Sequence, residues 1–474
     1  MSDCAPAFAW SETARAMQPS QGLRPSRARA AAPARPGGLG WGTRPAWAAR
    51  AARAAFRRPS WLVAAVVLSV GVPSGSPVFG PGLQIGPGDV ASVALVLAAA
   101  LLLATGRAWL PRAVLPAFGP MAAAVAVGTM CSTSVESSLP GFVRNVQLFV
   151  LVPVAVVALV RDRRDLAIVC SSLIALGLAE SGYGIWQSAT GNGAAMGEEN
   201  IRAVGTFGAA DVMAMSIVAA IAFLVLTVFA LVAPGRGRAA LPLALAGLGV
   251  LAAGLAVALS RGTWLALGAA GVFALVVFDR RIAVKALVCC GVLLLAAPAV
   301  AGGSTAVERA RSMAGSITSP DRSVQDRYHL WAAAGRMWQD HPVTGVGLKN
   351  FPAYRDSYAG IELSSGSDTA DPVRGYERQP LLSPHNQYLL FLAEQGVVGL
   401  AALAALFGTL LAGLWARRRP RDPFWLASAA LMTFLLVNFV YADLGGPTCV
   451  LFSVVLGVVA CRAFGEPAAG EARP

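Results

Sequence analysis

Charged side chains are scarce in this chain. Asp, Glu, Lys and Arg make up 13% of its 474 residues, whereas hydrophobic residues make up 56%. The mean hydropathy is +0.61. So little polar surface is not enough to cover a water-soluble globule of this size, which excludes that class. The composition instead predicts an integral membrane protein.

Several familiar chemical signatures are also missing. The seven cysteines form no C-x-x-C pair and no His-Cys metal spacing, so we expect neither a bound metal nor a cofactor. The absence of a Walker-type glycine-rich loop and of a Ser-His-Asp signature removes support for ATP-driven transport and for serine hydrolysis. The net charge of +13 is not accompanied by a basic-aromatic nucleic-acid motif, so nucleic acid is not an expected partner.

Long apolar runs recur from residue 61 to residue 464. Many approach the roughly 20 residues that a helix needs to cross a bilayer. They predict an all-α, polytopic membrane fold with about twelve transmembrane helices. The expected spans are 61–80, 89–105, 113–131, 146–160, 165–187, 212–233, 240–258, 262–278, 282–301, 386–415, 423–441 and 446–464.

The distribution of Lys and Arg gives an independent test of this topology, because short cytoplasmic loops collect positive charge. With both termini inside, 26 of the 38 basic residues fall on the inner side and nine lie in one long outer segment. Only Arg144, Arg202 and Arg261 remain in short outer loops. The charge count therefore supports an even number of spans and exposes three arginines that oppose the general bias.

The spans divide the chain into five parts. A basic tail rich in Ala, Arg and Pro comes first, and its composition predicts disorder at the cytoplasmic surface. The expected parts are the tail 1–58, transmembrane helices one to nine in 59–301, a large periplasmic loop in 302–384, helices ten to twelve in 385–464, and a short cytoplasmic tail in 465–474.

The outer loop is too long for a structureless connection, so local folding or a function is expected. Residues 323–338 have helical propensity, with Tyr328, Trp331 and Trp338 able to reach the membrane interface. Proline and glycines in 341–347 end that helix. The helix is either a cap over polar helix ends or a lid over a lipid-linked substrate, and its pattern fits both.

His385 lies where this polar loop enters the next apolar run, and it is one of only three histidines. An imidazole, with an ordinary pKa of about 6.5, can exchange protons with a bound substrate at such a boundary. The plainer interpretation is a polar residue at a helix start, where the neighbouring Asn386 could serve equally well as the cap.

Four short motifs, in order, resemble the O-antigen ligase and polymerase superfamily of bacterial surface-polysaccharide assembly. They are RAVGTF at 202–207, SRGTW at 260–264, DR at 326–327 with Trp331 followed by HP at 341–342 and GVG at 345–347, and HN at 385–386 followed by Gly396 and Gly399. One departure is Asp211, because the family often has a Pro-Asn pair after the first motif. The role of this aspartate stays open.

The resemblance implies a membrane glycosyltransferase of GT-C-like architecture in the bacterial inner membrane. Its donor would be a glycan on undecaprenyl diphosphate, its acceptor a glycan, lipid or protein, and its reaction metal-independent and inverting. His385 would be the catalytic base. Arg202, Arg261 and Arg327 would bind the diphosphate, since guanidinium groups grip phosphate oxygens in pairs.

Plainer explanations exist for each of these charges. Arg202 and Arg261 could snorkel at helix ends, which is the favoured interpretation for the unmatched Arg144. Arg327 could pair with a neighbouring aspartate. Glu180 is a carboxylate inside the fifth span, and a charge at such a position suggests a functional role. An ion pair with a nearby arginine would also explain its presence.

Four activities remain open at this stage. Ligase, chain-extending polymerase and protein O-oligosaccharyltransferase share the same donor chemistry and differ in acceptor, whose contacts we expect in residues 352–383. A secondary transporter would also have about twelve spans, but it should show broken helices near the bilayer midplane.

Overall fold

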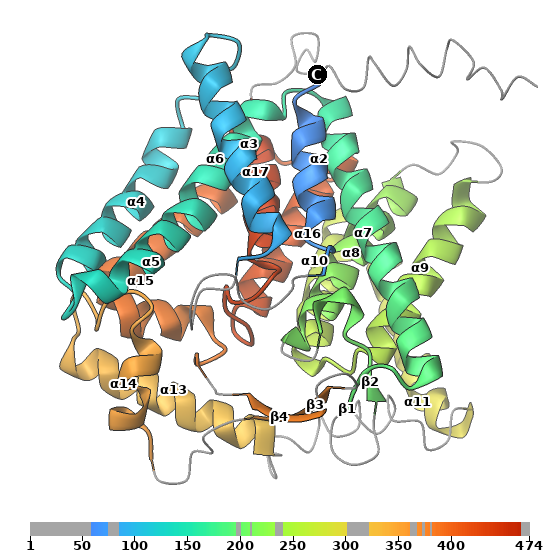
Figure 1. Cartoon of the computed structure of the whole chain (residues 1–474). Coiled ribbons are helices and arrows are strands. Elements are labelled where there is room, and N and C mark those ends of the chain that lie inside the picture. Colours follow the sequence, from blue (N-terminus) through green and yellow to red (C-terminus); the bar gives the residue numbers. More distant parts are fainter. Residues whose placement is uncertain are drawn as a thin grey trace, which may run out of the picture. The chain divides into compact units, whose positions relative to one another are not determined.

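The computed structural model describes residues 58–73, 85–195, 201–208, 211–232, 240–300, 322–360, 367–371, 375–379 and 382–465. Most of the predicted basic tail and all but the first residue of the C-terminal tail lie outside these ranges. Helices dominate the described chain (Figure 1). Those before the long loop are α2 (Ser60–Ser69), α3 (Pro87–Ala104), α4 (Val114–Met130), α5 (Val135–Val146), the π-helix η1 (Gln147–Leu151), α6 (Val152–Leu159), α7 (Arg163–Thr190), the 3-10 turn η2 (Gly205–Phe207), α8 (Ala214–Val232), α9 (Ala240–Val257), α10 (Arg261–Phe278) and α11 (Arg280–Val300).

The remaining helices belong to the long loop and the C-terminal part. They are α13 (Arg322–Asp340), α14 (Phe351–Tyr358), α15 (Gln387–Ala416), α16 (Pro423–Asn438) and α17 (Cys449–Phe464). Each of the twelve predicted spans contains a helix, although α2 covers only the first half of 61–80. Seven helical segments in the described ranges are long and apolar enough to cross a membrane. A helical membrane protein is thus confirmed, while the count of twelve stays a prediction.

Helix starts follow the capping residues in the sequence. The Asp162 side chain accepts hydrogen bonds from the amides of Arg164 and Asp165 at the start of α7. Asp422 does the same for Phe424 at the start of α16, where Pro423 supplies a preformed first turn. These two carboxylates lie at the same end of the helices.

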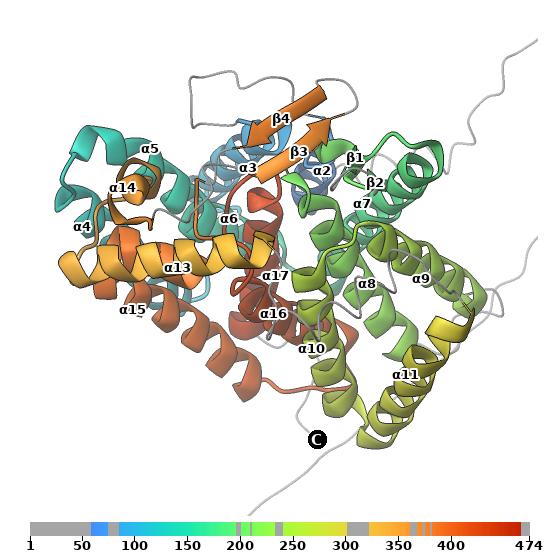
Figure 2. The ribbon, with the colours of Figure 1, turned by 90° about the horizontal axis from the view of Figure 1, so that it is seen from below.

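The expected helix in the outer loop is confirmed as α13. It runs across the ends of the membrane helices and lies beside the first part of α15 (Figures 1 and 2). Its buried side consists of Leu330, Ala334 and Met337, which pack with Val346 and Phe351. Trp331 donates from Nε1 to the Pro384 carbonyl at 2.9 Å, and its position at the membrane interface stays a prediction.

A small antiparallel sheet, which the sequence analysis did not predict, joins two distant segments. Its strands are β1 (Ala194–Ala195), β2 (Ile201–Arg202), β3 (Ser367–Asp371) and β4 (Gly375–Gln379), in the order β2-β1-β3-β4. Ala195 pairs with both Ile201 and Ala370. The sheet thereby ties the segment before α8 to the long outer loop.

Helix α15 is broken at Gly396, whose φ of 60° and ψ of −158° are not helical. The segment after α13 fills the break. The amides of Val397 and Val398 donate to the carbonyls of Pro342 and Val343, and the amides of Val346 and Gly347 donate to the carbonyls of Ala393 and Glu394; all four distances are between 2.9 and 3.2 Å. Backbone groups freed in a membrane helix need such partners. The break therefore anchors the outer loop in the helix bundle.

We predict that Gly396→Ala destabilises the protein strongly. A Cβ at this position would lie 2.3 Å from the Val343 carbonyl carbon, and the backbone conformation is nearly restricted to glycine. The cost should be about 3 kcal/mol or more. Thermal unfolding of the purified protein in detergent measures it.

Gly408→Ala in the same helix is the matched control. A Cβ there meets no atom within 4 Å, and alanine has the higher helix propensity by about 1 kcal/mol. Its unfolding midpoint should equal or exceed that of the wild type. Equal midpoints for the two variants would contradict the importance of the break.

Candidate functional site

His385 is fixed from both sides in a strained conformation. Its φ is 48°, in the left-handed region that non-glycine residues seldom adopt. Pro384 is held by Trp331, and on the other side the Gln387 amide donates to the Phe439 carbonyl at 2.8 Å. Asn386 caps α15 by accepting from the amides of Tyr388 and Leu389. Since Asn386 serves as the cap, the His385 imidazole is not used for that purpose.

The surroundings of His385 lower its pKa. Burial has the largest effect, the positive charge of Arg327 acts in the same direction, and the Asp443 carboxylate opposes both. A lowered pKa keeps the imidazole neutral at neutral pH, which is the form that accepts a proton. Arg327 and Asp443 are thus the charged neighbours of the predicted base.

Asp443 is the residue that the sequence analysis missed. It lies in the short connection between α16 and α17, and its Oδ2 atom is buried without a hydrogen-bond partner among the described residues. An aspartate in a short outer turn, followed by Gly445 and Gly446, was the available signal. Its carboxylate near His385 can stabilise the positive charge that a proton-accepting imidazole acquires.

Arg327 reaches the same connection from α13. Its guanidinium donates to the Tyr441 carbonyl at 3.0 Å. The Tyr441 side chain in turn packs on Gly262, where an added Cβ would lie 2.9 Å from the Tyr441 Cβ atom. Gly262 follows Arg261 at the start of α10. The α16–α17 connection thus joins the elements that carry Arg327, His385 and Arg261.

The start of α10 is held by a buried hydroxyl network. The Thr263 hydroxyl lies 2.9 Å from the Ser260 hydroxyl and 3.0 Å from that of Ser216 on α8. Leu259, just before the helix, has a φ of 51°. Arg261 is therefore the first residue of a helix whose start is tightly fixed. The positive end of the helix dipole and the guanidinium both favour an anion at this place.

Arg202 ends strand β2 and is buried, with 7% of its surface exposed. The next amide, of Ala203, donates to the carbonyl of Val257, the last residue of α9, at 3.1 Å. This bond places the segment of Arg202 beside the α9–α10 turn that leads into Arg261. The structure thus brings the elements carrying all four predicted site residues to the same end of the helices.

Two side chains of α7 hold the loop after Arg202. The Gln187 amide group accepts from the amides of Val204 and Gly205 at 3.2 and 2.8 Å and donates to the Gly205 carbonyl at 3.0 Å. Glu180 accepts from both the amide and the hydroxyl of Thr206 at 2.9 and 2.8 Å. Hydrogen bonds to this loop explain the buried Glu180.

Asp211 and Arg144 have different surroundings. Burial raises the pKa of Asp211 to about 6. Its carboxylate lies against Gly446 in the α16–α17 connection, where the glycine φ is 70°. Arg144 forms a part-buried ion pair with Asp89, instead of snorkelling towards the interface as expected. Asp211 therefore borders the site, whereas the charge of Arg144 is neutralised by Asp89.

These features define a polytopic helical membrane protein with arginines and a neutral histidine gathered at one end of its helices. Residues 246–404 match the sequence model of a family described as O-antigen ligase. This match supports the resemblance of that part of the chain to the O-antigen ligase and polymerase superfamily. No curated protein matches the chain. The matched range contains Arg261, Arg327 and His385, but neither Arg202 nor Asp443.

We predict that His385 titrates below its ordinary value of 6.5, and that Asp443→Asn lowers its pKa further. Removing the carboxylate destabilises the protonated imidazole, so more acid is needed to protonate it. With three histidines in the chain, a histidine-labelled sample in detergent gives few NMR signals, and His385→Gln assigns the one of interest. A pKa of 6.5 or more for His385 would contradict the described environment.

We also predict that Gln187→Ala speeds amide exchange at Val204 and Gly205. The change leaves backbone groups in the loop without their partner, at about 1–3 kcal/mol for each buried group. Hydrogen–deuterium exchange of a peptide covering 201–208 measures this. Ser172→Ala is the control, because this α7 hydroxyl bonds only to the Val169 carbonyl of its own helix in the described chain. Unchanged exchange in Gln187→Ala would show that other contacts hold the loop.

Proposed function

We propose that this chain is a membrane glycosyltransferase of the O-antigen ligase or polymerase type. It moves a glycan from an undecaprenyl diphosphate carrier to an acceptor hydroxyl at the outer face of the bacterial inner membrane. The main support is the position of Arg327, which contacts the Tyr441 carbonyl and lies within electrostatic range of His385. Through Tyr441 it also lies near the start of α10 with Arg261. Arg327, His385 and the start of α10 with Arg261 thus lie around the connection between α16 and α17.

The arginines bind the donor diphosphate. Arg261 combines its own charge with the positive end of α10, so the two reinforce each other on one anion. Arg202 and Arg327 add planar guanidinium groups suited to phosphate oxygens. In a site shielded from water, each contact that strengthens as the leaving group forms contributes about 3 kcal/mol to transition-state stabilisation.

His385 removes the proton from the acceptor hydroxyl. The acceptor oxygen then forms a bond with the anomeric carbon as the bond from that carbon to the diphosphate oxygen breaks. The electron pair leaves with undecaprenyl diphosphate, and attack from the opposite side inverts the anomeric centre. Asp443 stabilises the imidazolium that results. Because the arginines carry the charge of the leaving group, the step is proposed without a metal.

Replacement of His385 by Gln should reduce glycan transfer by about 10²–10⁴-fold, the usual contribution of a general base. Arg261→Lys should cost about 10²-fold, because lysine keeps the charge but loses the paired guanidinium contacts. Transfer from a defined undecaprenyl-diphosphate-linked glycan in proteoliposomes measures both effects.

The control is His341→Gln, which changes a half-buried histidine in the segment that enters the α15 break. It should retain transfer. All variants are compared at equal amounts of folded protein. Full transfer by folded His385→Gln would rule out the proposed base, and full transfer by Arg261→Lys would rule out the paired phosphate contact.

The acceptor decides between ligase, polymerase and protein O-oligosaccharyltransferase. We propose that the acceptor contacts residues 352–383. Strand β3 belongs to this range, and it pairs with β1, the strand that precedes the strand of Arg202. The transfer assay is therefore run with lipid, glycan and peptide acceptors in parallel. The acceptor class that yields product identifies the activity.

A secondary transporter is the second candidate, because the break of α15 at Gly396 is of the kind that holds substrates in transporters. Here the carbonyls of Pro342 and Val343 accept hydrogen bonds from the backbone amides that the break in α15 leaves free. The protein itself therefore fills the break, which favours the glycosyltransferase. The same proteoliposomes distinguish the two. Uptake of a solute without any glycan transfer would support the transporter.

A further inference from the structure

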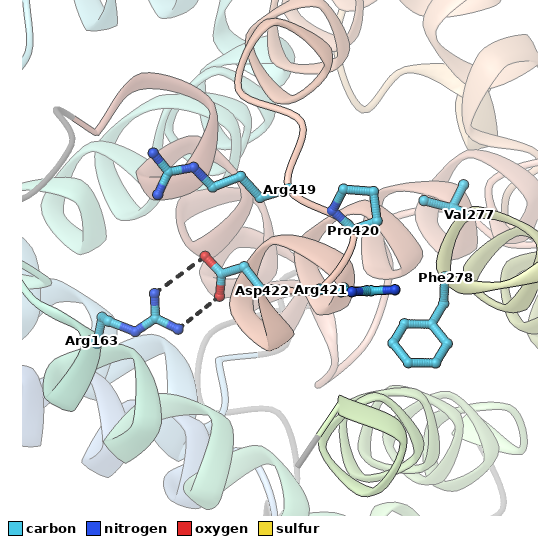
Figure 3. A pocket seen from close by; sticks show the side chains of 7 residues that line it. All are labelled: Arg163, Val277, Phe278, Arg419, Pro420, Arg421 and Asp422. Atoms are coloured by element: carbon cyan, nitrogen blue, oxygen red, sulfur yellow. Dashed lines mark hydrogen bonds and ion pairs between the residues drawn. The ribbon is translucent and has the colours of Figure 1, made fainter. Parts of the chain in front are cut away.

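A cavity of about 640 Å³ lies at the opposite end of the helices from His385 (Figure 3). It is formed where α7 and α16 begin, α10 ends, and the connection between α15 and α16 passes. The side chains that line it are both basic and apolar. Its principal lining residues are Arg163, Val277, Phe278, Arg419, Arg421 and Asp422.

The cavity carries an excess of positive charge. Its one carboxylate, Asp422, receives two guanidinium groups, from Arg163 at 3.0 Å and from Arg462 of α17 at 2.5 Å. Arg421 is exposed and has no ion-pair partner in the part of the chain that the structure describes. It lies between Asp422 and Phe278 in the view of Figure 3. The single carboxylate is thus outnumbered by the arginines that line the cavity.

The other wall of the cavity is apolar. Val277 and Phe278 come from the last turn of α10. The Phe424 ring does not line the cavity, but it lies under the Arg163 guanidinium, 5.1 Å from ring centroid to Cζ. A ligand that fits such a place has an anionic group beside a hydrocarbon part. A membrane phospholipid with a net negative charge combines the two.

We propose that this cavity binds the phosphate group of an anionic phospholipid, with Arg421 and Arg163 as its main cationic contacts and Phe278 beside its apolar part. Basic pockets between membrane helices bind such headgroups. The cavity lies at the ends of membrane helices, where headgroups are found, and the charge count assigns this end to the cytoplasmic leaflet. The bound lipid would join the ends of α7, α10 and α16 and stabilise the folded protein. This proposal does not depend on the glycosyltransferase activity.

The purified protein in neutral detergent tests the proposal. Phosphatidylglycerol should raise its thermal unfolding midpoint and remain bound in native mass spectrometry, whereas phosphatidylcholine should do neither. The double variant Arg419→Ala/Arg421→Ala removes Arg421 and a second lining cation but keeps the ion pair between Arg163 and Asp422. It should bind phosphatidylglycerol at least tenfold more weakly. Inorganic phosphate is added in a separate series to distinguish a lipid from a free phosphate ion.

Arg417→Ala/Arg418→Ala is the matched control. It removes two positive charges from the same connection, at residues that do not line the cavity. It should bind phosphatidylglycerol like the wild type. Equal weakening in both double variants, or equal binding of the two lipids by the wild type, would overturn the proposal. Binding of inorganic phosphate without a preference for phosphatidylglycerol would also overturn it. The wild-type lipid comparison is decisive even if a variant fails to fold.

Discussion

The hydrogen bonds that fill the break in α15 are the interaction on which the rest of the site depends. A helix that bends at Gly396 inside a membrane must find new partners for its backbone, and it finds them in residues 342–347. Those residues directly follow α13, so the bonds also fix where α13 can lie. Arg327 and Trp331 reach Tyr441 and Pro384 because that helix is held from its C-terminal end. A requirement of the lipid environment thus positions a cation beside His385.

Strain and charge are concentrated in the same region. Three described residues other than glycine have positive φ: Leu259 before α10, Lys349 after the segment in the break, and His385. Such conformations cost on the order of 1–3 kcal/mol each and persist where surrounding contacts enforce them. Around His385 these contacts come from α13, Asn386 and the end of α16. The imidazole is therefore placed by its neighbours, and its own backbone preference works against that placement.

The sequence predicted the parts of this arrangement that depend on composition. Apolar runs located the helices, and counting positive charges separated Arg202 and Arg261 from the arginines that serve topology. It did not reveal that Arg144 pairs with Asp89, because that contact is between residues of two different helices. Asp443 was missed because its importance depends on where the α16–α17 connection folds. The small sheet was missed because strands of two residues have no periodicity to detect.

The sheet joins the segment of Arg202 to the long outer loop through backbone hydrogen bonds. Pairing of this kind depends little on which side chains the strands carry. The sequence of β3 can therefore change while its backbone pairing with β1 persists. A backbone link of this kind can thus hold the segment of Arg202 in place without fixing the sequence of the strand that it pairs with.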